Sequence, residues 1–244
     1  MDRDVLIVGG GVAGLSAGLF TARAGLDTLV VSEGESILER NAHLENYPGF
    51  PAGVDARLLL RMTRDQAERA GVAFADGRVT DLSPADDGEG FAVATAGGDR
   101  YPAERVVAAS WSDASYLRDI DVGVVDRGSK AYADVEEGGR TDVDGVYAAG
   151  RLADEPHQAV VCAGHGAKVG LAVVHDSEAN FYHDWVAPEG YFTGRDRDVP
   201  PACEEIDDAE RRERERESRE LLREYLAEPL DDEPTMHPSV ADDE

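Results

Sequence analysis

Three glycines near the N-terminus have the spacing of a phosphate-binding turn. Gly9, Gly11 and Gly14 follow the aliphatic run 5–8 and form the pattern G-x-G-x-x-G. The first glycine permits a tight bend, the second lets backbone N–H groups approach a pyrophosphate, and the third lets a helix pack closely on a strand. The alternative is a structural turn, since glycine suits many strand-to-helix connections.

The segment after the turn favours the anion site. Residues 13–24 are small and predict a helix. Val12 and Ala13 stand at its N-terminus, where unpaired N–H groups and the helix dipole attract negative charge. Residues 28–31 predict a second buried strand, and Glu33 follows Gly14 at about the 20-residue spacing of an acid that binds ribose hydroxyls. The set predicts an adenine-dinucleotide site, although Glu33 could also be an ordinary solvated acid.

The composition limits the partners of the chain. Its 244 residues include 51 acidic and 24 basic side chains, which gives a net charge of -27, and among the basic residues only Lys130 and Lys168 are lysine. Such a chain repels nucleic acid and anionic membrane surfaces, so we expect neither as a partner. An acidic surface with arginine in place of lysine is typical of proteins kept soluble in concentrated salt, and we expect a halophilic source. The alternative is an acidic cytosolic protein with a charged tail.

The cysteines and the apolar runs exclude further classes. Cys162 and Cys203 lie far apart and neither belongs to a C-x-x-C, so the sequence predicts no disulfide, thiol redox pair or metal site. The first strand begins near residue 1, and no apolar run reaches the roughly 18 residues of a membrane span. We expect a soluble, cytoplasmic protein.

The order of the predicted elements indicates an α/β fold. A helix over 55–70 and strands over 72–75, 78–82, 91–96 and 105–109 follow the first β-α-β unit, with a hairpin arm at 100–101. A short strand ends at Gly150, and a helix that begins at 154–156 runs to about His175. Gly164, Gly166 and Gly170 weaken this helix, which indicates that something approaches it closely. We predict a doubly wound, Rossmann-like parallel sheet with a small β-meander over residues 1–176.

The remainder, residues 177–244, has a different character. Trp185, Pro188, Tyr191 and Phe192 predict an irregular segment with aromatic anchors. Residues 207–227 predict a charged helix with i,i+4 pairs of arginine and glutamate. We expect the residues after Pro229 to be disordered. The prediction for this second domain is an acidic extension with a helix and a disordered end.

Several segments occur in an order that resembles the thioredoxin reductase family. They are the glycine turn, Glu33, the run Glu-Asn-Tyr-Pro-Gly at 45–49, the run Gly-Val-Tyr-Ala-Ala-Gly at 145–150, and Gln158-Ala159. In that family these segments form the FAD domain, and the resemblance covers residues 1–174. It implies that Gly9, Gly11 and Gly14 hold the pyrophosphate of FAD and that Glu33 holds the adenosine ribose. It also implies that Val79 lies by the adenine and that Asn46, Gln158 and Ala159 lie by the flavin ring.

The chain also departs from the family pattern. The NADPH domain that the family inserts after the strand 105–109 is missing, and so is the C-x-x-C that passes electrons to thioredoxin. Ile37 stands in place of a flavin-contacting glutamine, Ser110 in place of a glycine, and Arg151 in place of the aspartate that follows Gly150. Arg151 could instead neutralise the pyrophosphate, since a guanidinium fits phosphate oxygens.

These observations give two hypotheses. The first is an FAD-dependent oxidoreductase that cannot use the NADPH and dithiol route and exchanges electrons with a protein, a second subunit in a homodimer, or a small donor. The second is a dinucleotide-binding sensor, or a structural subunit of a larger assembly, without turnover. His43 or His157 could act as an acid or base beside a flavin, but neither has a companion at a diagnostic spacing, and Cys162 is more typical of a small core residue. No catalytic residue is identified.

Overall fold

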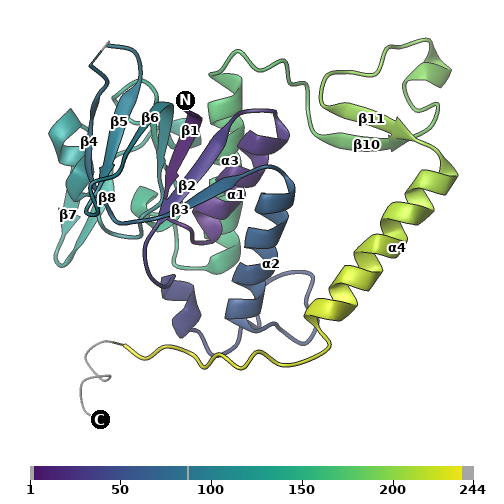
Figure 1. Ribbon diagram of the computed structural model, residues 1–244, viewed down its shortest axis with the longest axis horizontal. Coiled ribbons are helices and arrows are strands. Elements are labelled where there is room, and N and C mark those ends of the chain that lie inside the picture. The colour runs from purple at the N-terminus through teal and green to yellow at the C-terminus, as the bar shows by residue number, and fades with distance from the viewer. Residues whose placement is uncertain (1–2, 87, 238–244) are drawn as a thin grey trace. The chain divides into compact units, whose positions relative to one another are not determined.

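The computed structural model describes residues 3–86 and 88–237 (Figure 1). The described chain divides into two compact units: one extends to Ser177 and includes the residues from Pro234, and the other is Glu178–Glu233.

The first unit is built on a parallel sheet. β1 (Arg3–Val8) lies between β2 (Thr28–Ser32) and β6 (Arg100–Ala108), and β3 (Ala73–Asp76) and β9 (Val146–Ala148) extend the sheet beyond β2 and β6. All these pairs are parallel, so β1, β2, β6 and β9 end at the same edge. In parallel α/β sheets that edge is where ligands bind.

The β-meander shares a strand with this sheet. β4 (Val79–Pro84) pairs antiparallel with β5 (Phe91–Thr95), and β5 pairs antiparallel with the first half of β6. The sequence predicted a hairpin arm at 100–101 and a separate strand at 105–109, and this was wrong in detail. Residues 100–108 form one nine-residue strand, because Pro102 lies where it does not interrupt the pairing.

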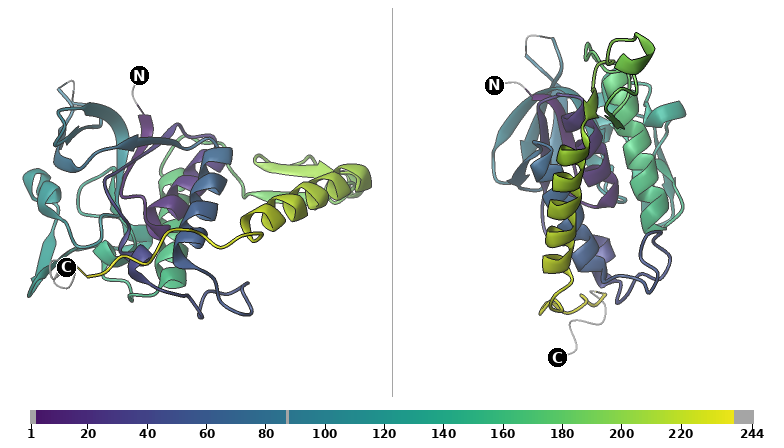
Figure 2. Two further views of the ribbon diagram at one scale, coloured as in Figure 1. Left: turned by 60° about the horizontal axis from the view of Figure 1, so that its bottom comes forward. Right: turned by 90° about the vertical axis from the view of Figure 1, so that its right-hand side faces the viewer.

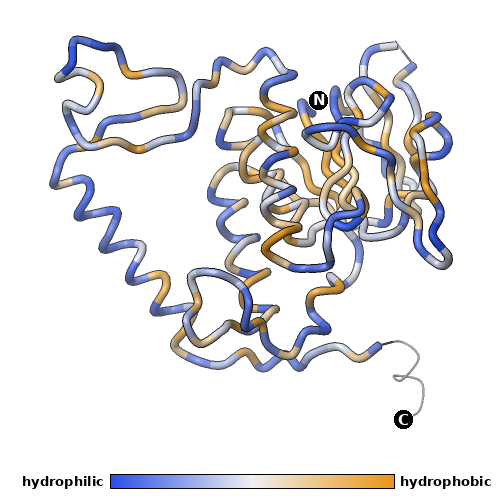
Figure 3. The backbone as a smooth tube through the Cα atoms, turned by 180° about the vertical axis from the view of Figure 1, so that it is seen from behind, coloured by the Kyte–Doolittle hydropathy of each residue, from blue (hydrophilic) through white to orange (hydrophobic). Residues whose placement is uncertain are grey.

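Three helices cover one face of the sheet (Figures 1 and 2). They are α1 (Val12–Arg23), α2 (Ala56–Arg69) and α3 (Ala159–His175). Along β1, Val5 and Ile7 pack in the helical layer, whereas Leu6 and Val8 pack with the meander on the opposite face. This alternation follows from the two-residue period of a strand. Figure 3 shows the same strands as an apolar centre.

The predicted close approach at the last core helix is between α3 and α1. A Cβ at Gly166 would lie 2.0 Å from the backbone oxygen of Ala13, and one at Gly170 would lie 2.7 Å from that of Ala17. The prediction is confirmed for these two glycines. It was wrong for Gly164, which is exposed and has no atom near its Cβ position.

The start of α3 also differs from the prediction. Residues 150–153 form a 3-10 helix, Asp154 adopts a left-handed conformation with φ of 59°, and α3 begins at Ala159 with Gln158 as its N-cap. The acidic pair and proline at 154–156 therefore belong to a turn before the helix. A second 3-10 helix (Ile37–Arg40) lies between β2 and α2, and Ser36 and Glu39 form its capping box.

The segment between β6 and β9 holds short elements. A 3-10 helix (Ser115–Ile120) is followed by β7 (Val124–Arg127) and β8 (Lys130–Ala133), which pair as an antiparallel hairpin. In the sequence of this segment only residues 121–125 have a strand-like composition, and they overlap β7 at its start; nothing in the sequence predicts β8.

The second unit has more regular structure than predicted. β10 (Trp185–Pro188) and β11 (Cys203–Ile206) form a parallel pair, and α4 (Asp208–Tyr225) follows. Aromatic side chains of Trp185, Tyr191 and Phe192 contact one another, so the predicted anchors form one cluster. Ion pairs on α4 include the predicted pairs of Arg214 with Glu210 and of Glu215 with Arg211 and Arg219.

Two further predictions concern the C-terminus and membranes. Residues 230–237 contain no helix or strand, and 238–244, also predicted to be disordered, lie outside the described residues. Among the helices that the structure describes, none combines the length and apolar character needed to cross a bilayer.

Candidate cofactor-binding site

Two glycines of the N-terminal turn are required by the fold itself. Gly9 has φ of +112°, and a Cβ there would lie 2.5 Å from the backbone oxygen of Ala109. A Cβ at Gly14 would lie 2.0 Å from the oxygen of Gly9. These glycines permit the bend after β1 and the close packing of α1 on it, as the spacing predicted.

Gly11 is different, because the protein leaves room for a side chain there. Its φ is -78°, which any residue adopts, and the nearest atom to its Cβ position is Ser36 Oγ at 3.5 Å. Neither backbone strain nor packing within the chain explains a glycine here. The open space in front of the turn is what a pyrophosphate needs in order to reach backbone N–H groups.

The two helices that begin at the site have uncapped N-termini. The N-cap of α1 is Gly11, which has no side chain. The N-cap of α3 is Gln158, whose side chain makes no capping hydrogen bond, and neither helix has an acid in its first turn. By contrast, Asp55 caps α2 and Asp207 caps α4. The first N–H groups of α1, which include those of Val12 and Ala13, therefore have no competing side chain and face the space at Gly11 with a positive dipole end.

The predicted adenosine end lies beside the turn. Glu33 directly follows β2 and is exposed, and no described residue pairs with its carboxylate. Gly77 donates a backbone hydrogen bond of 2.9 Å to the carbonyl of Ser32, which brings the start of β4 to the end of β2. Val79, the first residue of β4, is buried. The fold thus places Glu33 and the start of β4 at the sheet edge that carries the glycine turn.

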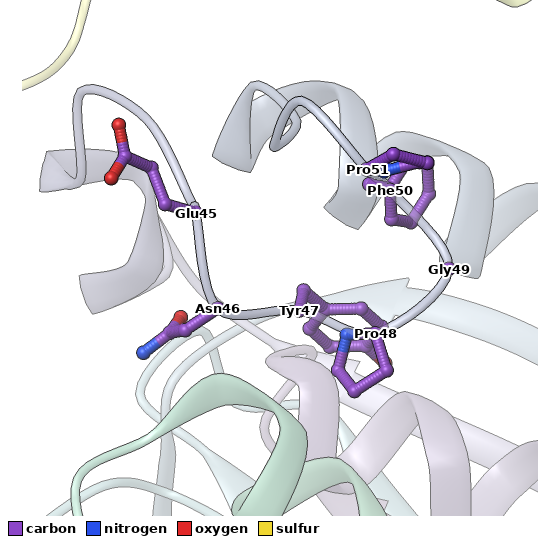
Figure 4. A pocket seen from close by; sticks show the side chains of 7 residues that line it. All are labelled: Glu45, Asn46, Tyr47, Pro48, Gly49, Phe50 and Pro51. Carbon is purple, nitrogen blue, oxygen red and sulfur yellow. The ribbon is translucent and has the colours of Figure 1, made fainter.

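The predicted flavin contacts are brought together from distant parts of the sequence. Asn46 Nδ2 donates a 2.7 Å hydrogen bond to Gln158 Oε1, although 112 residues separate them. Residues 45–51 line a hollow of about 400 Å³, and Asn46 lies at its edge (Figure 4). The bond leaves the second N–H of Asn46 and both of Gln158 available as donors. Ala159 begins α3 next to this pair.

Gly150 completes the edge at the end of β9. It has φ of +64°, and a Cβ there would lie 2.7 Å from the Cβ of Ala13, so the two predicted motifs touch. Its N–H donates a 3.0 Å hydrogen bond to His165 Nδ1. The ring proton of a neutral His165 therefore lies on Nε2, which is 3.6 Å from a carboxylate oxygen of Glu155. Burial lowers the pKa of His165, and this favours the neutral form that the bond requires.

Arg151 has partners within the chain. Its guanidinium donates a 2.6 Å hydrogen bond to Tyr132 Oη and another to the carbonyl of Glu155, and it lies 3.7 Å from a carboxylate oxygen of Asp154. These contacts fix the β7–β8 hairpin against the 3-10 helix at 150–153. A contact with phosphate stays a prediction.

The two other departures from the family pattern are accommodated locally. Ile37 begins the capped 3-10 helix and is half-buried. Ser110 donates a 2.7 Å hydrogen bond to the carbonyl of Asp113 and is 2.7 Å from Tyr116 Oη. Its hydroxyl is thus held by the turn after β6.

The candidate acid and base residues lie in ordinary environments. His43 Nε2 is 3.1 Å from the carbonyl of Ala52 in an exposed loop. His157 contacts the Trp111 ring edge-on, and burial together with the charges of Arg151 and Lys130 lowers its pKa. Cys162 is buried in the helical layer, and burial raises the pKa of its thiol, which makes it a poor nucleophile. None has the companion group that proton transfer or nucleophilic attack would need.

Sequence reasoning missed His165 and Tyr132, which hold Gly150 and Arg151. His165 is seven residues beyond Gln158, two turns into α3, a spacing that places both on one helix face. That periodicity was the available signal for His165. Tyr132 lies on an unpredicted strand, and nothing in the sequence links it to Arg151.

Parts of the chain are similar to known proteins in sequence and in fold. The sequence profile of a family described as "FAD binding domain" matches residues 4–40, which contain the glycine turn and Glu33. Thioredoxin reductases of Aquifex aeolicus and Listeria monocytogenes are 43% identical over 84 residues and 36% identical over 112 residues. The chain carries a thioredoxin reductase-like FAD domain. The alignments span 33% and 45% of it, but 26% and 34% of those two relatives.

Solved structures show the same fold for the thioredoxin reductase-like domain. A thioredoxin reductase from Gloeobacter violaceus matches with a TM-score of 0.61 and 20% identity, over 71% of this chain and 95% of that one. An oxidoreductase from Agrobacterium tumefaciens matches with a TM-score of 0.63 and 18% identity, over 72% of this chain and 98% of that one. The predicted Rossmann-like fold is therefore confirmed.

Proposed function

We propose that this chain is a flavoprotein that binds FAD along the edge formed by β1, β2 and β9. The observation that carries the proposal is the open space at Gly11, a glycine that the fold does not need, in front of an uncapped helix. The amides of α1 would hold the pyrophosphate, Glu33 the ribose, Val79 would lie by the adenine, and Asn46, Gln158 and Ala159 by the flavin ring. Bound flavin would supply the redox chemistry, and the chain would bind and orient it.

The cofactor is tested by the spectrum of the gently purified protein. We expect absorbance at about 450 nm from oxidised flavin and release of FAD on denaturation. Gly11→Val should abolish FAD binding while the melting temperature stays unchanged, because the new Cβ meets no protein atom closer than 3.5 Å. Gly194→Val is the matched control, since its Cβ position is also open, with no atom within 4 Å, and lies in the second unit. A folded Gly11→Val variant with wild-type affinity for FAD would contradict the proposal.

We further propose that the flavin is not reduced through the family's NADPH and dithiol route. This rests on the segment from residue 109 to 145, where the family inserts its NADPH domain and where this chain has two 3-10 helices, Ser115–Ile120 and Glu137–Gly139, and one hairpin. NADPH and NADH should therefore reduce the bound flavin slowly or not at all in anaerobic stopped-flow mixing. Reduction within milliseconds would overturn this part of the proposal. If the nucleotides do not reduce the flavin, its electron donor or acceptor is a protein, a second copy of the chain, or a small molecule.

Arg151 is proposed to neutralise the pyrophosphate by exchanging one of its present partners for a phosphate oxygen. Arg151→Ala should then weaken FAD binding by about 1.5 to 3 kcal/mol, as for a hydrogen bond to a charged group. Tyr132→Phe controls for loss of hairpin packing, because it keeps the ring and removes the hydroxyl that the guanidinium contacts. Equal effects of the two substitutions would assign Arg151 a structural role.

The second candidate function is a dinucleotide-binding sensor or a structural subunit. The departures at Ile37, Ser110 and Arg151 favour it, because each replaces a residue that the family uses near the cofactor. A protein that binds FAD but does not exchange electrons with any added donor would support this function. The acidic composition favours a halophilic source for either function, and a cytoplasmic location stays a prediction.

A further inference from the structure

The indole ring of Trp111 lies near the proposed flavin contacts. Trp111 follows β6 with φ of 61°, a left-handed conformation that is uncommon for a bulky residue. Its ring centroid is 4.6 Å from that of His157, and the ammonium of Lys130 lies 5.6 Å from it. We call Trp111, Lys130 and His157 the Trp111 cluster. His157 is the neighbour of Gln158, which bonds to Asn46.

The charge of the cluster is opposite to that of the protein. Within residues 110–157, all of which the structure describes, the arginines pair with carboxylates: Arg118 with Asp126, Arg127 with Asp154, and Arg140 with Asp176. Arg151 also faces Asp154. Lys130 is exposed and has no carboxylate partner among the described residues. One of two lysines in a chain of net charge -27 thus stands uncompensated above an indole ring.

We propose that the Trp111 cluster is a binding site for a small planar aromatic anion. The half-buried indole offers an apolar surface for ring stacking, and Lys130 offers the countercharge for a carboxylate or sulfonate at the rim of the ligand. Burial, together with the charges of Arg151 and Lys130, lowers the pKa of His157 and favours its neutral form, so its ring adds an edge contact with little added charge. The site is distinct from the glycine turn and does not require bound FAD, so it extends the proposed function without depending on it.

Two commercially available compounds test the site by equilibrium dialysis. 2-Naphthoate is a planar anion, and 2-naphthamide has the same ring system without the charge. We expect the protein to bind naphthoate at least fivefold more tightly than naphthamide. Lys130→Gln should weaken naphthoate binding about fivefold, a loss of about 1 kcal/mol, and leave naphthamide binding unchanged. Lys168→Gln is the matched control, because Lys168 pairs with Glu137 on the exposed side of α3.

The ring is tested by Trp111→Gly, which suits the left-handed backbone and therefore preserves the fold. It should weaken both compounds tenfold or more, whereas Trp185→Leu in the second unit should weaken neither. Equal affinity for the two compounds, equal effects of the two lysine substitutions, or an unchanged affinity in Trp111→Gly would overturn the proposal. Each dialysis is repeated with saturating FAD, and loss of naphthoate binding there would assign the probe to the cofactor site and also overturn it. If Trp111→Gly fails to fold, the comparison of Lys130→Gln with Lys168→Gln and the comparison of naphthoate with naphthamide still test the proposal.

Discussion

Helices α1 and α3 differ from α4 in what stabilises them. α1 and α3 bury much of their length against the sheet and against each other, whereas α4 buries no residue. Most of its seven acids and six arginines instead form ion pairs one turn apart along the helix, and in Figure 3 it is mostly hydrophilic. Tertiary packing thus stabilises α1 and α3, whereas ion pairs within the helix stabilise α4.

The N-termini follow the same division. Asp207 accepts a 2.8 Å hydrogen bond from the N–H of Glu210 in α4, whereas α1 and α3 have no side-chain cap. A helix held by its neighbours can leave its first N–H groups free for a ligand, because the loss of a cap costs about 1 kcal/mol and burial offsets more than that. A helix that depends on its own interactions cannot.

The largest effect should come from separating α1 and α3. Gly166→Leu would place a side chain into the backbone of Ala13, and we expect the free energy of unfolding to fall by about 3 kcal/mol or more. Gly164→Ala, two residues away and exposed, should raise it by up to about 1 kcal/mol. Urea denaturation measures both. A mild effect of Gly166→Leu would show that α1 and α3 can separate without loss of the fold.

An intermediate effect is expected from the bond between α3 and the turn at Gly150. The pKa of His165 is lowered in the folded state by burial and by Lys168, and Glu155 opposes this. The neutral ring is therefore favoured by folding, and the stability it contributes is complete above the ordinary pKa of 6.5 and is lost as the pH falls below it. Between pH 7.5 and 5.5, wild type should lose more stability than His165→Asn. His43→Gln, at an exposed histidine, should behave like wild type, and parallel pH profiles for all three would contradict this account.

A smaller effect distinguishes the capped helices. Asp207→Ala should destabilise α4 by about 1 kcal/mol, and Asp55→Ala should destabilise α2 by a similar amount. In α2 the loss should appear in the global free energy of unfolding, because α2 packs on the sheet. In α4 it should appear as faster amide hydrogen exchange confined to residues 208–225. A global loss in Asp207→Ala would mean that α4 is not stabilised on its own.

The smallest expected effect is that of salt on amide hydrogen exchange, which should differ between the packed helices α1 and α3 and the exposed helix α4. The Debye length falls from about 10 Å at 0.1 M salt to about 3 Å at 1 M. Screening should relieve repulsion in the acidic body and slow exchange in α1 and α3. In α4 it should weaken pairs worth about 0.3 to 0.5 kcal/mol each and speed exchange. Slower exchange in α4 at high salt would show that repulsion outweighs its ion pairs.

The parallel sheet and the turn at its edge could be predicted because their signals are local. Residues 3–32 carry an aliphatic strand, the glycine spacing and a second strand within one continuous segment, and α4 carries its pairing pattern in its own sequence. Asn46 and Gln158 were placed together through the family resemblance, since no local pattern links residues 112 positions apart.

The errors occurred where tertiary contacts decide the local structure. The acidic residues and proline at 154–156 have the composition of a helix start, but the bond from Gly150 to His165 and the contacts of Arg151 hold these residues in a turn. β8 has little strand character, and its pairing with β7 and the contact of Tyr132 with Arg151 define it. Propensity is a weak guide where such contacts compete with it.

The self-supporting character of α4 has a consequence for anything joined to it. A helix of 18 residues holds its ends about 27 Å apart, at 1.5 Å per residue. A flexible chain of the same length would have a root-mean-square span of about 23 Å, nearly the same average. The ion pairs change the range of end-to-end distances. A flexible chain samples distances from contact to full extension, whereas the helix keeps a single distance. A protein tethered beyond Tyr225 would therefore be held at a nearly fixed distance from the segment before Asp208. Its effective concentration at that segment would be set by the length and direction of the helix.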